Sequence, residues 1–356
     1  MGYQHGGMHY QYPDAIDFSA NLNPFGMPEA VKEAAYHGII DAVYYPDTEC
    51  IQLREKIAEH ENRKAGIAVI KKEHIVLGNG AAELIFQVCH AIKPKHALLV
   101  VPTFQEYEQA LLCEQCDIKY YELQEAFDFQ VKETFLDLLR KEIDVIFLCN
   151  PNNPTGQLVD DKILSRILEY CEENHILLVM DECFMDFCID RKSLIEKTAR
   201  YKQLFIVKAF TKLYAMPGLR LGYGISSNKK LLQAICDNRQ PWNISTPAQY
   251  AGIAALGEET YVSQSTSSIA RERMYLLQEI QNNQLAEHVV SPAANYIFFK
   301  AEERLGKSLL KKGFILRDCG NYRNLKNGYY RMAIRLHEEN AQLIKAWKEC
   351  VQEWQK

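Results

Sequence analysis

The chain has 356 residues, 47% of them apolar and 24% charged, with a formal net charge of -5. This length favours one large domain and one smaller domain. Because Lys and Arg gather in no single segment, the composition argues against a nucleic-acid or membrane-surface protein and favours small-molecule partners. No run reaches the roughly 20 apolar residues of a membrane span, and the N-terminus lacks a signal-peptide pattern, so we expect a cytoplasmic protein.

The eleven cysteines, an odd number, lie mostly in apolar surroundings, as at Cys149, Cys171 and Cys183. This usage predicts reduced thiols in a protein core. The only CxxC pattern, Cys113 to Cys116, has no second pair and no His at metal-ligand spacing. We therefore expect no metal site, and interpret this pair as buried thiols at the end of a helix.

The first 28 residues are rich in Gly, Pro, Asn and Tyr and predict an arm that crosses a cavity. A helix is predicted from Pro28 to about Asp41, followed by a turn in YYPD and a second helix over about 50–61.

Seven short apolar runs follow His74 and alternate with helical patterns, which predicts a mostly parallel sheet covered by helices on both faces. Ligands of such sheets bind at the carboxyl ends of the strands. The runs are HIVLGNG, HALLVVPTF, IKYYEL, DVIFLCNPNNPTG, ILLVMDECF, LFIVKAF and LRLGYGI.

The C-terminal third predicts a long helical region after Pro241, to about Gln284, then the runs NYIFFKA and GYYRMAIRL around a helix near Leu305, and a last helix to Trp354. This pattern indicates a smaller α+β domain. We assign 1–49 to the arm and part of the small domain, 50–240 to the large domain, and 241–356 to an interdomain helix and the small C-terminal domain.

Lys212 follows the apolar run LFIVKAF, where a lysine is placed to form a Schiff base. Strand-end motifs supply what pyridoxal phosphate requires of a protein. Asp181 would keep the ring nitrogen protonated, Phe104 would stack on the ring, and Asn153 would donate to the phenolic oxygen. The glycine turn before a helix at 80–82 would bind the phosphate.

Each of these residues also has a simpler interpretation. Lys212 could be a surface lysine, Asp181 a helix N-cap, and Phe104 a core aromatic residue. The turn GNGAAE lacks the third glycine of a dinucleotide-binding pattern, because Glu83 occupies that position, which argues against a nicotinamide-dependent dehydrogenase.

Several motifs together resemble fold-type I pyridoxal-phosphate enzymes of the aspartate aminotransferase superfamily, an α/β fold with a mostly parallel sheet and a smaller α+β domain. Within it, the chain is most similar to the histidinol-phosphate aminotransferase branch, and closer still to the threonine-phosphate decarboxylases of cobalamin biosynthesis. The motifs are NPNNPTG, DE at 181–182, TK before PGLRLGY, HGG, DFSANLNPFG, YYPD, QPWNIS and YYRMAIR.

The resemblance implies a role for each matching residue. Lys212 would bind the cofactor covalently, and Arg331 would hold the substrate carboxylate with its planar fork. Tyr45 would reach the cofactor phosphate of a neighbouring subunit, which implies a homodimer with shared active sites. The other implied cofactor contacts are Gly80, Ala81, Ala82, Phe104, Asn153, Asp181, Phe184, Thr211 and Arg220.

Three positions depart from the common pattern of the superfamily. Phe184 stands where many aminotransferases place a tyrosine hydroxyl against the phenolic oxygen, and the decarboxylases resemble this chain in having Phe. Ala209 replaces a Ser or Thr that contacts the phosphate, and Lys208 replaces a common Arg. These changes suggest a weaker phosphate site, for which Thr211 and Lys208 could compensate.

The expected substrate is phosphorylated, because the cations of these motifs exceed what the cofactor and one carboxylate require. Arg335 is favoured, since alternate residues of a strand share a face with Arg331. The other candidate substrate contacts are His5, Asn23, Lys208, Arg317 and Arg323.

We therefore expect decarboxylation of O-phospho-L-threonine or O-phospho-L-serine. The alternative is an aminotransferase that acts on histidinol phosphate or an aromatic amino acid. A protein that binds the cofactor without catalysis would not need Lys212, Asp181, Asn153 and Arg220 together. Orientation of the Cα substituents relative to the ring decides between the two reactions.

Overall fold

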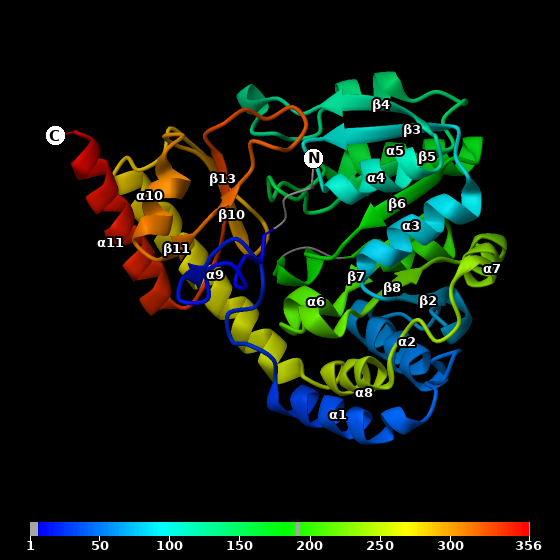
Figure 1. Cartoon of the computed structure of the whole chain (residues 1–356). Helices are drawn as coiled ribbons and strands as arrows, with labels where there is room; N and C mark the ends of the chain where they lie inside the picture. Colours follow the sequence, from blue (N-terminus) through cyan, green and yellow to red (C-terminus); the bar gives the residue numbers. More distant parts are fainter. Residues whose placement is uncertain (1–5, 190–192, 356) are drawn as a thin grey trace.

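The computed structural model describes residues 6–189 and 193–355. Its larger part is a seven-stranded sheet in the order β2-β8-β7-β6-β5-β3-β4 (Figure 1). Strand β8 is antiparallel to both of its neighbours, and the other pairs are parallel. The strands are β2 (Ile75–Gly78), β3 (His96–Val101), β4 (Asp117–Glu122), β5 (Val145–Cys149), β6 (Leu177–Asp181), β7 (Leu204–Ala209) and β8 (Gly222–Ile225).

The central strands are buried along their whole length because helices cover both faces of the sheet. Alternate residues face opposite sides, so Val179 and Val207 join one apolar cluster while Leu178 and Ile206 join another. The first cluster includes residues of α3 (Ala81–Ile92), α4 (Gln105–Cys113) and α7 (Lys229–Asn238), and the second those of α2 (Ile51–Ala65) and α5 (Asp161–Asn174).

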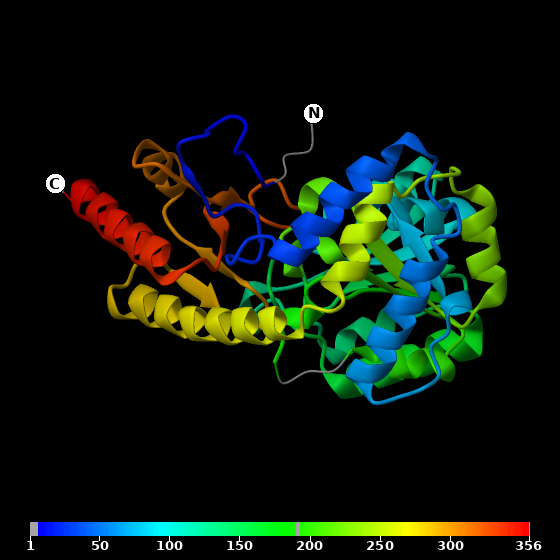
Figure 2. The same cartoon turned by 90° about the horizontal axis from the view of Figure 1, so that it is seen from below.

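The smaller part contains an antiparallel sheet in the order β12-β13-β10-β9. The long helix α9 (Glu259–Asn282) runs from the large part along this sheet (Figure 2). The other elements here are β9 (His288–Val290), β10 (Tyr296–Lys300), α10 (Leu305–Lys311), β11 (Phe314–Ile315), β12 (Arg317–Asp318), β13 (Tyr329–Ala333) and α11 (His337–Trp354).

The N-terminal arm joins the two parts. Its strand β1 (Ile16–Asp17) pairs in parallel with β11 of the smaller part. The next helix, α1 (Glu29–Ile40), instead packs on α8 (Thr246–Ala255) beside the large sheet. Gly38 permits this close contact, since a Cβ atom there would lie 2.6 Å from Cα of Pro247. The chain between β1 and α1 therefore passes between the two parts.

The seven apolar runs predicted as strands form the seven strands of the large sheet. The region predicted as helical from Pro241 to about Gln284 consists of two helices, because α8 ends at Ala255 and α9 begins at Glu259. The short strands β1, β9, β11 and β12 were not predicted. The remaining short helices are α6 (Phe210–Leu213) and the 3-10 turns η1 (Asp41–Val43), η2 (Lys72–His74), η3 (Glu125–Phe127), η4 (Glu133–Leu138), η5 (Met185–Phe187), η6 (Leu194–Ala199) and η7 (Pro217–Leu219).

Two expectations about cysteines need correction. Cys113 is exposed, because it ends α4 on the surface, whereas Cys116 is buried as expected. Cys183 is half-buried and, with Cys149, lines a cavity rather than the core alone. Within the described ranges, no helix combines the length and apolarity that crossing a bilayer requires.

Candidate active site

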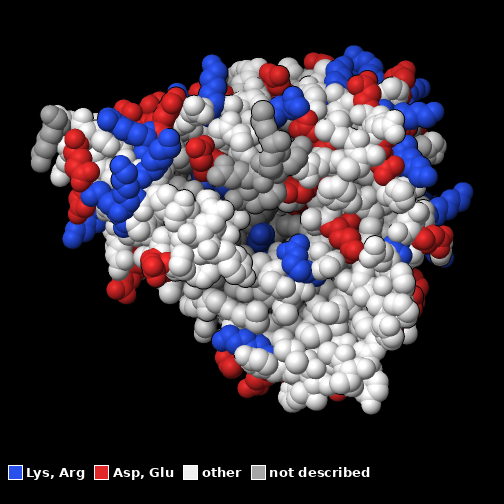
Figure 3. All heavy atoms as spheres, in the orientation of Figure 1, with Lys and Arg blue, Asp and Glu red and all other residues white. Residues whose placement is uncertain are grey.

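A cavity of about 380 Å³ lies where the carboxyl ends of the large-sheet strands meet the arm and the smaller part. The space-filling view shows a hollow at this position (Figure 3). Strand ends and loops of the large part supply Phe104, Asp181 and Lys212, the arm supplies Asn21, and the small sheet supplies Arg331. Residues far apart in sequence thus meet at the edge where open α/β sheets bind ligands.

Lys212 lies in the single-turn helix α6, directly after β7. Burial and, second to it, the nearby Arg331 guanidinium lower the pKa of its amine to about 8. A substantial fraction of the amine is therefore neutral at physiological pH. A neutral amine is the form that attacks a carbonyl carbon or accepts a proton.

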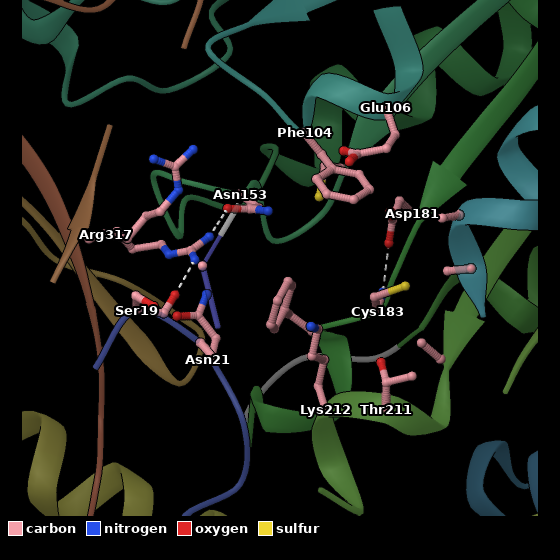
Figure 4. A pocket seen from close by; sticks show the side chains of 18 of the residues that line it. Ser19, Asn21, Phe104, Glu106, Asn153, Asp181, Cys183, Thr211, Lys212 and Arg317 are labelled. Carbon is pink, nitrogen blue, oxygen red and sulfur yellow. Dashed lines mark hydrogen bonds between the residues drawn. The ribbon is translucent and has the colours of Figure 1, made fainter. Parts of the chain in front are cut away.

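Asp181 ends strand β6 and lines the cavity, where Figure 4 shows its contact with Cys183; its carboxylate is held by two hydrogen bonds. The hydroxyl of Tyr107 donates to Oδ2 at 2.6 Å, and the backbone N–H of Cys183 donates to Oδ1 at 2.9 Å. Tyr107 is itself held by stacking on Phe147 at 5.2 Å between ring centroids. These contacts hold a buried carboxylate in one orientation within the cavity.

The N-terminus of α3 opens onto the cavity at Ala81 and Ala82. Gly80, which precedes them, has a φ of 84°, and a Cβ atom there would lie 2.4 Å from Nη2 of Arg220. Only glycine therefore lets the guanidinium lie against this turn. Arg220 and Thr211 both line the cavity, so a cation, a hydroxyl and a helix N-terminus converge as an anion-binding site requires.

Asn153, labelled in Figure 4, lines the cavity and is in contact with Arg331. Nη1 of Arg331 donates to Oδ1 of Asn153, and Nη2 donates to the Ser19 carbonyl at 2.8 Å. The hydroxyl of Tyr322 also donates to Oδ1 of Asn153, at 3.5 Å. With its oxygen occupied, Asn153 is left with its Nδ2 hydrogens as donors.

A family model described as aminotransferase class I and II matches residues 13–346. The chain belongs to the aminotransferase class I and II family. It is 34% identical to a threonine-phosphate decarboxylase of Salmonella typhimurium over 94% of this chain and 91% of that protein.

Two solved structures have the same fold as this aminotransferase-family chain. The histidinol-phosphate aminotransferase of Clostridium acetobutylicum is 30% identical, covers 94% of this chain and 99% of its own, and has a TM-score of 0.87. The L-threonine-O-3-phosphate decarboxylase of Porphyromonas gingivalis is 21% identical over 94% and 99%, with a TM-score of 0.83. The fold is that of the aspartate aminotransferases, as the resemblance implied.

Class I and II aminotransferases are pyridoxal-phosphate enzymes, and this member uses the same cofactor. The chemistry of the cavity fits that group. It contains an amine of lowered pKa, a buried carboxylate and, at the α3 N-terminus, an arginine beside a glycine turn. Among the described residues, no group of three or more His, Cys, Asp or Glu side chains is placed to hold a metal ion.

Two aromatic residues predicted as cofactor contacts also line the cavity of this family member. Phe104 follows β3 and packs edge-on against Tyr107, with 5.6 Å between centroids. Phe184 packs edge-on against Tyr296, with 5.0 Å between ring centroids. Because phenylalanine has no hydroxyl, this position offers none to the cavity. Ala209 lines the cavity as well.

Several predicted substrate contacts lie elsewhere. Asn23 is buried, but its Nδ2 donates to the Leu213 carbonyl at 2.9 Å and to Ser265 Oγ at 2.8 Å, so it fixes the arm. Arg335 comes after the end of β13 and is not among the described residues that line the cavity; it pairs with Glu339 at 2.7 Å.

Other predicted residues also lie away from the cavity. Lys208 of β7 is buried in an ion pair with Asp186 at 2.9 Å, and Arg323 forms an ion pair with Glu108. Tyr45 is 80% exposed and stacks on Trp242 with 4.5 Å between centroids. His5 lies outside the described residues.

Sequence reasoning missed part of the cavity lining. Asn21 lies in the motif DFSANLNPFG, but its neighbour Asn23 was predicted as the substrate contact. No sequence pattern indicates which of the two side chains faces the cavity. Glu106 follows Phe104 in the sequence, but no pattern marked it as a residue of the cavity. The missed residues of the cavity wall are Gly6, Ser19, Ala20, Asn21, Glu106, Cys149, Cys183 and Tyr322.

Proposed function

We propose that this pyridoxal-phosphate enzyme decarboxylates O-phospho-L-threonine or O-phospho-L-serine. The products would be carbon dioxide and the corresponding amino alcohol phosphate, (R)-1-aminopropan-2-yl phosphate or ethanolamine phosphate, for assembly of the cobalamin nucleotide loop. The bound cofactor would supply an electron sink for the pair of electrons left on Cα when the C–C bond breaks.

The observation that carries the proposal is a pair of buried arginines on adjacent strands. Arg317 of β12 is directly opposite Arg331 of β13 in the antiparallel register, so both side chains share one face of the sheet. Both line the cavity, and they expose only 3% and 6% of their surface. Two adjacent buried cations at a cavity wall favour an anionic ligand, and a phosphoamino acid offers two anionic groups, a carboxylate and a phosphate.

The other residues have roles that follow from their positions. Arg220 and the α3 N-terminus would hold the cofactor phosphate, leaving Arg317 and Arg331 for the substrate. Lys212 would hold the cofactor and afterwards deliver a proton to Cα. Asp181 would keep the cofactor ring nitrogen protonated, and Asn153 would donate to the phenolic oxygen.

The alternative is an aminotransferase acting on histidinol phosphate or an aromatic amino acid. Similarity to the aminotransferase of Clostridium acetobutylicum favours it. Phe184 favours the decarboxylase, because a hydroxyl at the phenolic oxygen is missing as in that branch. Histidinol phosphate has a phosphate but no carboxylate. Its single anionic group would therefore pair with only one of the two arginines, Arg317 and Arg331.

One incubation distinguishes the two reactions. Purified enzyme is given O-phospho-L-threonine or O-phospho-L-serine, with and without 2-oxoglutarate, and carbon dioxide and glutamate are measured. We expect carbon dioxide without any keto acid. Glutamate formed only when 2-oxoglutarate is present would contradict decarboxylation and assign the aminotransferase.

We also infer that the enzyme is a homodimer in which Tyr45 reaches the cavity of the partner. Tyr45 and Trp242 stack at the surface, in an exposed apolar region formed by α1, η1 and the segment around α8. Such a surface is typical of a protein interface. Sedimentation of the purified protein at the mass of one chain at micromolar concentration would contradict this inference. The exposed apolar residues are Tyr36, Ile39, Ile40, Val43, Tyr44, Tyr45, Trp242 and Tyr250.

A further inference from the structure

Tyr322 is a tyrosine of the cavity wall that contacts two other residues of the site. It lies in the loop between β12 and β13 and exposes 6% of its surface. Its hydroxyl donates to Oδ1 of Asn153 at 3.5 Å, and the Arg317 guanidinium lies over its ring, with 5.1 Å between Cζ and the ring centroid. This distance is within the range of a cation–π interaction. Tyr322 is therefore a direct neighbour of an arginine that we assign to the substrate.

Arg317 lies opposite a second cation, so other groups must hold it in place. Its partner in the strand register is Arg331, and both side chains are buried. Like charges directly opposite each other on a sheet repel. Nη2 of Arg317 donates to Oδ1 of Asn321 at 2.9 Å, and Nη1 donates to the Asp318 carbonyl. These hydrogen bonds hold the edge of the guanidinium, and the Tyr322 ring covers one of its faces.

Arg331 also lies over a tyrosine ring. Its Cζ is 5.6 Å from the ring centroid of Tyr296, whose hydroxyl donates to the Asn152 carbonyl at 2.7 Å. Each arginine of the pair therefore has one aromatic face beside it. The face of a tyrosine ring carries partial negative charge, so it stabilises a buried cation. Unlike a carboxylate, the ring does not neutralise the guanidinium, which keeps its positive charge for an anionic ligand.

The loop that carries Tyr322 is fixed to the large part on both sides of the ring. Before it, Nε2 of Gln105 donates to the Asn321 carbonyl at 2.8 Å. After it, Nδ2 of Asn324 donates to the Leu123 carbonyl at 3.0 Å. A loop held in this way keeps the ring in one position, as a residue that orients a binding group requires.

We propose that Tyr322 is a positioning residue whose ring holds the Arg317 guanidinium at the cavity wall, where Arg317 binds an anionic group of the substrate. The proposal rests on the proposed function in that the substrate carries such a group. Because Tyr322 acts through Arg317, its loss should weaken substrate binding only as long as Arg317 is present.

The first test compares wild-type holoenzyme with Tyr322→Leu, which removes the ring face, and Tyr322→Phe, which keeps it. Dissociation constants of O-phospho-L-threonine and of histidinol phosphate are taken from the initial change of cofactor absorbance, before turnover. We expect Tyr322→Leu to weaken binding about 5- to 30-fold, the range of a desolvated cation–π contact. Tyr322→Phe should stay within about threefold of the wild type, since it restores the ring. Equal weakening by the two variants would overturn the proposal.

Arg317→Met shows whether Tyr322 acts through the arginine. This variant should weaken binding more than Tyr322→Leu does, because the cation itself is lost. Adding Tyr322→Leu to it should change the dissociation constant less than about twofold, since no guanidinium remains to be held. A further loss as large as in the wild-type background, or unchanged binding by Arg317→Met alone, would contradict the proposal.

A matched tyrosine separates the positioning role from an effect on stability. Tyr201 exposes 7% of its surface, and Arg200 lies over its ring at the same distance of 5.1 Å. Neither is among the described residues that line the cavity. Tyr322→Leu and Tyr201→Leu should both lower the melting temperature, because each removes a buried ring. Only Tyr322→Leu should weaken ligand binding, and equal weakening by Tyr201→Leu would leave Tyr322 with a structural role alone.

The two ligands distinguish this proposal from the proposed function. If the wild-type enzyme binds histidinol phosphate but releases no carbon dioxide from O-phospho-L-threonine, the proposed decarboxylation fails. Weaker binding of histidinol phosphate by Tyr322→Leu, with Tyr322→Phe close to the wild type, would then still support the role of Tyr322.

Discussion

Lys208 and Lys212 lie four residues apart, at the end of β7 and just after it, and both are buried. Their pKa values nevertheless shift in opposite directions: that of Lys208 is raised and that of Lys212 is lowered. Burial alone would lower both values. Around Lys208 the carboxylates of Asp186 and Glu61 outweigh burial and raise its pKa. Around Lys212 the Arg331 guanidinium adds to burial and lowers its pKa to about 8.

The difference shows how this protein uses a buried lysine for structure in one region and for chemistry in the next. Lys208 belongs to a paired cluster in which Lys64 also contacts Asp186 and the hydroxyl of Tyr223 donates to Glu61. Lys212 faces a cavity whose neighbouring charges do not compensate its own. A buried lysine that is paired with carboxylates stays protonated as an ammonium ion. A buried lysine without such a counter-charge loses its proton more easily and becomes a reactive neutral amine.

The largest expected effect comes from removing the reactive lysine. We expect Lys212→Met to lower activity by about 10⁴-fold or more, because no other described amine lines the cavity. The absorbance band of the covalently bound cofactor should also disappear, as spectra of the purified variant would show.

The stability of the cofactor-free Lys212→Met protein supplies the control for this prediction. It should equal or exceed that of the cofactor-free wild type in urea unfolding, since a buried amine without a counter-charge is lost. A variant that keeps the covalent absorbance band would refute the assignment of Lys212.

The next effect concerns the paired lysine. We expect Lys208→Met to lower the free energy of unfolding by about 3–5 kcal/mol, because it leaves Asp186 and Glu61 buried without their cation. Urea unfolding of the cofactor-free protein measures this change.

An exposed pair provides the matched control for Lys208. Lys56 contacts Glu59 at 2.7 Å, but both side chains are more than half exposed. Lys56→Met should therefore change the free energy of unfolding by only about 0–1 kcal/mol. Equal losses for the two variants would show that the buried cluster contributes no more than a surface ion pair.

The sequence predicted the large sheet and the strand ends that precede or bear Asp181 and Lys212, because short continuous apolar runs and strand-end motifs are local signals. It could not separate Asn21 from Asn23, since the face that each presents depends on how the arm crosses between two parts distant in sequence. Arg335 lies away from the described cavity lining for a related reason: β13 ends at Ala333, so the alternation that relates it to Arg331 no longer applies.

Likewise, nothing local distinguished the partners of Lys208 from those of Lys212. Glu61 comes from α2 and Arg331 from β13, both far from the lysines in sequence. Motif reasoning assigned both lysines to phosphate or cofactor chemistry, and only tertiary contacts separate the buried ion cluster from the cavity.

The smallest predicted effect is the pH dependence of cofactor capture by Lys212. Only the neutral amine attacks the aldehyde of pyridoxal phosphate, so the rate of covalent binding to cofactor-free enzyme should rise with pH and reach half of its maximum near pH 8. Below that pH, each unit should slow capture about tenfold, since the neutral fraction falls tenfold. Stopped-flow absorbance measures the rate.

Replacing Arg331 by Met removes a neighbouring cation and should move the midpoint to higher pH, whereas Lys56→Met should leave it unchanged. A midpoint near 10.5 in the wild type, the ordinary value for lysine, would show that burial and Arg331 do not set the state of this amine.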